Sequence, residues 1–152
     1  MTKKILAIIT NRFEEYTKYA FLFVRKFIHE IDKFYIITTK ENYEKIKEYI
    51  IFNHEIIFFN NEWFFPKKVP YSFYYYGLEL ANINDENSII YVTGDGGFYT
   101  KNPFKFIEQY ENNFENYDII NTIYENRSMD TGCFFKNNNR SKSFLKIFFV
   151  GV

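Results

Sequence analysis

The sequence predicts an α/β domain in which helices cover both faces of a mostly parallel sheet, a three-layer α/β/α sandwich. Short apolar runs of strand length alternate with segments of helical periodicity through the first two-thirds of the chain. This alternation is typical of parallel strands joined by crossover helices. The chain of 152 residues has the length of one domain, and no repeat or linker interrupts it. We therefore expect a single domain over residues 1–152.

Apolar runs with the length and composition of strands recur along the chain. The expected strands are residues 4–10, 34–39, 55–59, 89–92, 117–123 and 133–136. The segments 60–71, which holds Trp63 and two prolines, and 128–132 are expected to be loops.

Helical spacing of apolar residues predicts helices between the strands. The first helix is expected to start with Asn11 as its N-cap. The residues expected to face the sheet from it are Phe13, Tyr16, Ala20, Phe23, Phe27 and Ile31. Further helices are expected at residues 41–50, 73–82 (capped by Ser72) and 104–113, and residues 141–149 are expected to be a helix or a frayed apolar tail.

The charge balance and the apolar segments disfavour two classes of function. The 19 basic residues equal the 19 acidic ones in number, and no long run of one sign occurs. This balance argues against a nucleic-acid interface, which needs clustered Lys and Arg. The first apolar run is short and ends at Asn11-Arg12, so it predicts a strand rather than a signal peptide. No segment is apolar enough to span a bilayer, and we expect a cytoplasmic protein.

Several conspicuous residues have simple structural explanations. The aromatic share of 23% accompanies abundant Ile, Lys and Asn, which indicates a biased coding composition rather than a binding surface. The single cysteine, Cys133, is expected to be a small buried apolar residue. His29 is expected to be solvated, and His54 to be structural, since no metal-ligating residue lies near it at ligand spacing.

The strand at residues 89–92 runs directly into Thr93-Gly94-Asp95-Gly96-Gly97. A strand that ends in glycines and one carboxylate puts that carboxylate at the carboxyl edge of the sheet, where open α/β sheets bind their ligands. Mg²⁺ is commonly held by one or two carboxylates together with substrate phosphates. The loop therefore predicts that Asp95 holds a phosphate-bound divalent metal. The alternative is a plain turn in which Asp95 bonds its own backbone.

The common catalytic motifs are absent from the chain. No G-x-G-x-x-G follows the first strand, no P-loop occurs, and no G-x-S-x-G nucleophile elbow is present. One cysteine and two distant histidines do not make a structural zinc site.

The order of elements and three short motifs resemble the GT-A glycosyltransferases, and more narrowly the nucleotide-diphospho-sugar transferases with their Rossmann-like fold. Their pattern is a strand, D-x-D, a nearby proline and a later N-T-G. In this sequence Thr93-Gly94-Asp95 takes the place of D-x-D, with Asp95 as its second acid and Thr93 replacing the first. Lys101-Asn102-Pro103 matches the stretch before the following helix, and Asp130-Thr131-Gly132 matches N-T-G with Asp in place of Asn.

The resemblance implies a metal site and a donor site. Asp95 would hold a Mn²⁺ or Mg²⁺ ion that bridges the donor's two phosphates. The residues implied to bind the donor nucleotide are Thr10, Asn11, Arg12, Thr93, Gly94, Asp95, Arg127, Asp130, Thr131 and Gly132. Arg12 or Arg127 would add positive charge, since arginine binds phosphate oxygens in a bidentate way. The alternatives are an exposed surface arginine at 127 and a turn-stabilising role for Asp130. No residue stands out as a general base.

The implied function is transfer of a sugar from a nucleotide-sugar donor to a carbohydrate or glycoconjugate acceptor, with the metal as a Lewis acid on the leaving diphosphate. Domains of that family continue beyond the N-T-G loop, whereas this chain stops at Val152. We therefore expect a minimal or C-terminally truncated relative. One alternative is a catalytically inactive domain of the same fold that binds a nucleotide or a protein partner, which Thr93 favours. Another is a structural domain that self-associates through its aromatic surface.

Overall fold

The computed structural model describes residues 2–10, 15–59, 69–94, 102–109, 114–124 and 127–147. At residues 15–16, 69–71, 122–124 and 127–131 it describes the backbone alone.

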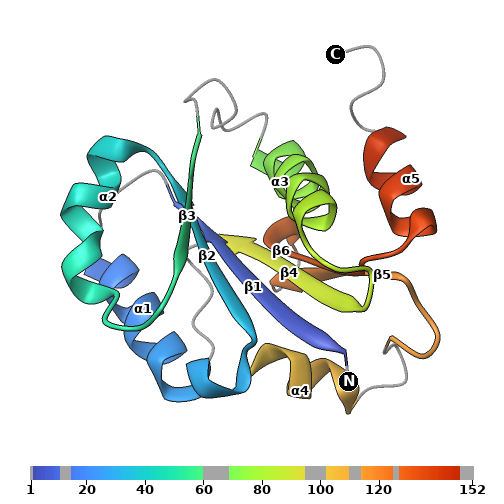
Figure 1. Cartoon of the computed structure of the whole chain (residues 1–152), viewed down its shortest axis with the longest axis horizontal. Coiled ribbons are helices and arrows are strands. Elements are labelled where there is room, and N and C mark those ends of the chain that lie inside the picture. Colours follow the sequence, from blue (N-terminus) through green and yellow to red (C-terminus); the bar gives the residue numbers. More distant parts are fainter. Residues whose placement is uncertain are drawn as a thin grey trace.

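The described strands form one mixed sheet with the order β3-β2-β1-β4-β6-β5 (Figure 1). They are β1 (Lys3–Ile9), β2 (Lys33–Thr38), β3 (Glu55–Phe58), β4 (Ser88–Gly94), β5 (Ile119–Tyr124) and β6 (Arg127–Lys136). Strands β1 to β4 pair with one another in parallel, whereas β6 is antiparallel to both β4 and β5. The predicted mostly parallel α/β sandwich is confirmed.

Helices cover both faces of this sheet (Figure 1). They are α1 (Glu15–Phe27), α2 (Lys40–Ile46), α3 (Val69–Ile83), α4 (Pro103–Glu108) and α5 (Asn139–Ile147). Short 3₁₀ turns at Ile28–Glu30 and Lys47–Tyr49 follow α1 and α2. One apolar layer joins the sheet to α1, α2 and α4, and the other joins it to α3 and α5.

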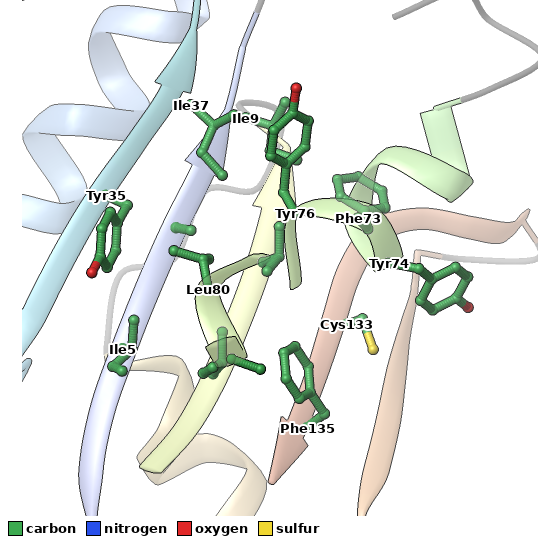
Figure 2. Packing of buried hydrophobic residues seen from close by; sticks show 14 of the residues in the cluster. Ile5, Ile9, Tyr35, Ile37, Phe73, Tyr74, Tyr76, Leu80, Cys133 and Phe135 are labelled. Atoms are coloured by element: carbon green, nitrogen blue, oxygen red, sulfur yellow. The ribbon is translucent and has the colours of Figure 1, made fainter. Parts of the chain in front are cut away.

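Alternate residues of the strands enter these two layers, because successive side chains of a strand point to opposite faces. In β1, Ile5 and Ala7 pack in the layer of α3 and α5, whereas Leu6 packs in the layer of α1, α2 and α4. Figure 2 shows the layer of α3 and α5, with side chains of α3 lying over the sheet. In the second layer the rings of Tyr91 and Phe134 stack with centroids 3.7 Å apart. Each fully buried side chain of this size contributes about 1.5–3 kcal/mol to folding.

The buried side of α1 differs by one position from the prediction. Ala20, Phe27 and Ile31 are buried as expected, but Phe21 and Val24 take the place predicted for Phe23, which is half-buried. Lys26 Nζ lies 4.9 Å from the centroid of the Phe23 ring, so this ring is partly covered from the solvent side. Aromatic residues occupy several adjacent positions of this helix, so their spacing alone does not fix which side is buried. Asn11 and Phe13 lie outside the described residues, as does the side chain of Tyr16.

The start of α3 corrects the predicted loop at residues 60–71, of which 60–68 lie outside the described part. Residues 69–71 already belong to the helix, and Ser72 is a buried residue inside it rather than its cap. Pro70 fits this start, because the first turn of a helix does not use its backbone N–H groups. The start of α4 has a side-chain cap: the side chain of Asn102 accepts a hydrogen bond of 3.0 Å from Phe104 N.

The predicted loop at residues 128–132 is also wrong, because β6 runs unbroken from Arg127 to Lys136. The strand predicted at 133–136 is the second half of this longer strand. The predicted helix at 104–113 is shorter in the described part, where α4 ends at Glu108.

The two histidines have the structural roles that the sequence predicts. His54 bonds the carbonyl oxygen of Phe52 through Nδ1 and the hydroxyl of Tyr43 through Nε2, both at 2.9 Å. His29 is exposed at the end of the turn that follows α1. Neither histidine lies near the carboxyl edge of the sheet.

Candidate functional site

The strand order reverses between β1 and β4. From β1 the chain adds β2 and β3 on one side, and it returns with β4 on the other. Open α/β sheets bind ligands in the crevice beyond the carboxyl ends of the strands at such a reversal. The last residues paired there are Ile8 with Thr93 and Ile9 with Gly94. The structure therefore brings the end of the first strand next to the start of the loop that holds Asp95.

Three buried threonines end the strands at this edge. Thr10 follows β1, Thr38 is the last residue of β2, and Thr93 is the last but one of β4; each is at most 1% exposed. Each stands two residues after a side chain that packs in the layer of α1, α2 and α4: Ile8, Ile36 and Tyr91. By the alternation of strand side chains they share that face. The apolar face of the sheet therefore ends in a row of threonine side chains at its carboxyl edge.

Thr38 of this row, and Asn42, which bonds it, were missed by the sequence reasoning. Asn42, in the first turn of α2, donates from Nδ2 to Thr38 Oγ1 at 3.0 Å, and its backbone N donates to Thr39 Oγ1 at 3.1 Å. The pair Thr38-Thr39 ends β2 in the way that Thr10 ends β1. A threonine at the end of an apolar strand was the available signal at both β1 and β2.

Gly94 and Gly132 bring three segments close together at the end of β4. A Cβ atom added to Gly94 would lie 3.9 Å from the ring of Phe73 in α3. Across the sheet, Gly132 of β6 pairs with Thr93 of β4 and with Thr122 of β5. The predicted Asp130-Thr131-Gly132 segment therefore lies in a strand beside Thr93, not in a loop above it. The conformation expected for this segment was wrong, and its role in a donor site stays a prediction.

The other predicted site residues remain predictions. Asn11, Arg12 and Asp95 lie outside the described residues, and only the backbone of Arg127, Asp130 and Thr131 is described. In the part of the chain that the structure describes, no group of three or more His, Cys, Asp or Glu side chains could hold a metal ion.

Two cavities open at the opposite, amino edge of the sheet. One, of about 580 Å³, lies at the start of β4 and is lined among others by Asn87, Ser88 and Asn137. The other, of about 600 Å³, lies at the starts of β2 and β3 beside Lys33 and Glu55. Both hold charges of mixed sign, and neither includes a predicted site residue. The cavities therefore do not mark the predicted site.

Cys133, next to Gly132, is not a nucleophile. Its thiol is buried in the layer beneath α3, and burial raises the pKa of Cys133 to about 12. A thiol protonated at neutral pH is a poor nucleophile and a poor metal ligand. The predicted role as a buried apolar residue is confirmed.

The comparisons with known proteins give a likeness of fold. No family model matches the sequence, and no curated protein matches it. Among solved structures, the chain is similar to the 4-diphosphocytidyl-2C-methyl-D-erythritol synthase of Anaerococcus prevotii, with a TM-score of 0.59 and 11% identical residues. The likeness covers 98% of this chain and 76% of that one. At this identity it shows a shared fold, and it does not single out the GT-A glycosyltransferases.

The helices of the described part also bear on membrane association. None of them is long and apolar enough to cross a bilayer.

Proposed function

We propose that the chain binds a nucleotide at the carboxyl edge of β1 and β4 and uses it as the donor in a transferase reaction. The observation that carries this proposal is the pairing of Gly132 with Thr93 at the point where the strand order reverses. It brings the D-T-G segment, the start of the acidic loop and the end of β1 to one place. The name of the structurally similar synthase describes a product with a diphosphocytidyl group, which agrees with a nucleotide ligand.

In its more specific form, the proposal is a glycosyltransferase with a nucleotide-diphosphate sugar as donor and a carbohydrate or glycoconjugate as acceptor. Asp95 would hold a Mn²⁺ or Mg²⁺ ion on the diphosphate. A metal in that position stabilises the charge that grows on the leaving group. One carboxylate is sufficient for such an ion, because Mg²⁺ keeps several waters and takes further ligands from the phosphates.

The residues proposed to surround the donor are the ends of three segments. Thr10, Asn11 and Arg12 follow β1 and would contact the nucleotide. Thr93 and Gly94, which lead into the loop of Asp95, would line the site. In β6, Arg127 would supply positive charge to the phosphates. Asp130 and Thr131 would supply hydrogen bonds to the sugar.

A second candidate is a domain of the same fold that binds a nucleotide without catalysis. The observation in its favour is that Thr93, which stands where the first acid of D-x-D is expected, is only 1% exposed. A buried hydroxyl brings no charge to a metal. Under this candidate the nucleotide would bind, and transfer would not follow.

The test is calorimetric titration of the purified chain with UDP, GDP, CTP and the corresponding nucleotide sugars, with and without Mn²⁺ or Mg²⁺. We expect metal-dependent binding of one of them. Absence of binding to all of them, in a sample shown to be folded, contradicts both candidates. If one nucleotide sugar binds, release of its nucleotide in the presence of acceptor mixtures distinguishes the transferase from the inactive domain.

A further inference from the structure

The hairpin formed by β5 and β6 projects beyond the end of β4. Residues 132–136 of β6 pair with β4, whereas β6 itself begins at Arg127. Residues 127–131 therefore continue past the last pair with Thr93, and at about 3.3 Å per residue they reach roughly 16 Å. Tyr124 pairs with Arg127, so the two strands are still paired at this point.

The base of this hairpin is fixed to the rest of the fold. Asn121 Oδ1 accepts a hydrogen bond of 3.3 Å from the hydroxyl of Tyr74 in α3. Asn121 pairs across the hairpin with Cys133, which is buried. The regular register of β5 and β6 then shifts between Thr122 and Tyr124. The hairpin is therefore regularly paired and anchored at residues 119–121 and 133–135, and its register shifts next to Gly132.

Gly132 stands where the anchored base meets the projecting part. It has a φ of 148°, a backbone conformation that residues with side chains rarely adopt. A Cβ atom there would lie 2.2 Å from the carbonyl oxygen of Val92 and 2.9 Å from the Cα atom of Thr93. Both contacts are with the backbone of β4, so no change of rotamer could relieve them. Any side chain at this position must push β6 away from β4.

We infer that Gly132 is the positioning residue of the proposed nucleotide site: its missing side chain lets β6 lie against the end of β4 and thereby fixes the backbone of residues 127–131 at the carboxyl edge of the sheet. Gly132 itself offers no side chain to a ligand, so its role is to set a distance and not to bind. The inference rests on the proposed nucleotide-binding function.

The first test is the nucleotide affinity of Gly132→Ala, with Leu80→Ala as the control. Leu80 is fully buried in α3, seven residues after Phe73 and next to Ala81, whose carbonyl bonds Asn137 at the amino edge. Its truncation should lower stability by about 2–5 kcal/mol without disturbing the carboxyl edge. At a temperature where both variants are folded, we expect Gly132→Ala to bind the nucleotide at least about tenfold more weakly, since small misplacements in a site have large effects. Leu80→Ala should bind like the unchanged chain. Equal affinities of the two variants would make Gly132 a purely structural residue.

The second test needs no ligand. Amide hydrogen exchange of residues 92–94, measured by NMR and corrected for global stability, should accelerate in Gly132→Ala and not in Leu80→Ala, because β6 no longer holds the end of β4. Unchanged exchange overturns the inference whether or not a nucleotide binds. If the unchanged chain binds no nucleotide while the exchange effect is present, the proposed function fails and the role of Gly132 in fixing β6 stands.

Discussion

The two edges of the sheet are built from different kinds of residue. At the amino edge, long polar side chains tie separate segments together: Lys3 pairs with Asp85 at 3.0 Å, and Asp32 accepts a hydrogen bond of 2.7 Å from Lys4 N. At the carboxyl edge the described residues are short, with threonines ending the strands and glycines at 94 and 132. The amino edge is thus joined by polar contacts between separate segments, whereas the carboxyl edge ends in small, buried residues.

Asn137 shows most clearly what the amino edge does. It follows β6, and its Nδ2 atom donates to the carbonyl oxygens of Ala81, Asn84 and Asp85, at 3.0, 3.2 and 2.9 Å. It therefore joins the end of α3 and the turn before β4 to the end of β6. The cavity of about 580 Å³ beside it belongs to this amino edge.

The largest expected effect tests the amino edge. Asn137→Ala should lower the free energy of unfolding by about 3 kcal/mol or more, because buried carbonyl groups lose their donor. Nucleotide affinity should not change in the folded variant. Urea unfolding gives the first quantity and calorimetry the second. Asn139→Ala, an exposed asparagine two residues away, is the matched control and should be nearly neutral. A loss below about 1 kcal/mol for Asn137→Ala would refute its role as a tie.

The next effect tests the buried threonine of the carboxyl edge. Thr93→Asp places a carboxylate at a buried position, so it should lower stability by about 2 kcal/mol when no metal is present. If the segment occupies the place of D-x-D, Mn²⁺ should restore the lost stability by binding the folded state. Thermal unfolding in EDTA and in Mn²⁺ measures both. A variant that Mn²⁺ does not stabilise more than it stabilises the unchanged chain would speak against the alignment with D-x-D.

A smaller effect compares one carboxylate from each edge. Asp95→Ala should weaken metal-dependent nucleotide binding about tenfold or more, or about 1.4 kcal/mol, and leave the melting temperature nearly unchanged. Asp118→Ala should lower the melting temperature and leave nucleotide affinity unchanged. Asp118 accepts a hydrogen bond of 3.0 Å from Asn138 and forms an ion pair of 2.8 Å with Arg140 at the start of α5, so its loss should affect stability alone. Undiminished affinity in Asp95→Ala would remove that residue from the site.

The smallest effect concerns Cys133, one residue inside the carboxyl edge. Burial raises the pKa of this thiol from about 9 to about 12. A raised pKa in the folded state gives a stability that is fully present below the unfolded value and is lost as the pH rises toward the folded value. Cys133 should therefore contribute a loss of about 1 kcal/mol between pH 9 and 10.

The contribution of Cys133 can be isolated by substitution. In urea unfolding at several pH values, Cys133→Ala should decline less steeply above pH 9 than the unchanged chain. Parallel pH profiles of the two proteins would mean that the thiol is already solvated at the edge. Rapid reaction of the native thiol with a labelling reagent would lead to the same conclusion.

Much of the fold could be predicted from short stretches of sequence. The four parallel strands were identified within a residue or two, because an apolar run between polar turns has few other solutions in a domain of this size. Ion pairs form along α2 and the turn after it, where Glu41 faces Lys45 and Glu44 faces Lys47. The start of α3 was missed because proline is also a signal of a loop, and only the observed backbone shows that Pro70 lies in the first turn of a helix.

The candidate site divides in the same way. The sequence by itself determined that a glycine-flanked carboxylate follows a buried strand and that a threonine ends the first strand, because these features depend on neighbours in the chain. Only the tertiary structure decided that β6 enters the sheet between β4 and β5, that Gly132 meets Thr93, and that Asn137 ties the opposite edge. Strand pairing between distant residues depends on how complete apolar faces fit together, and a local pattern does not contain that information.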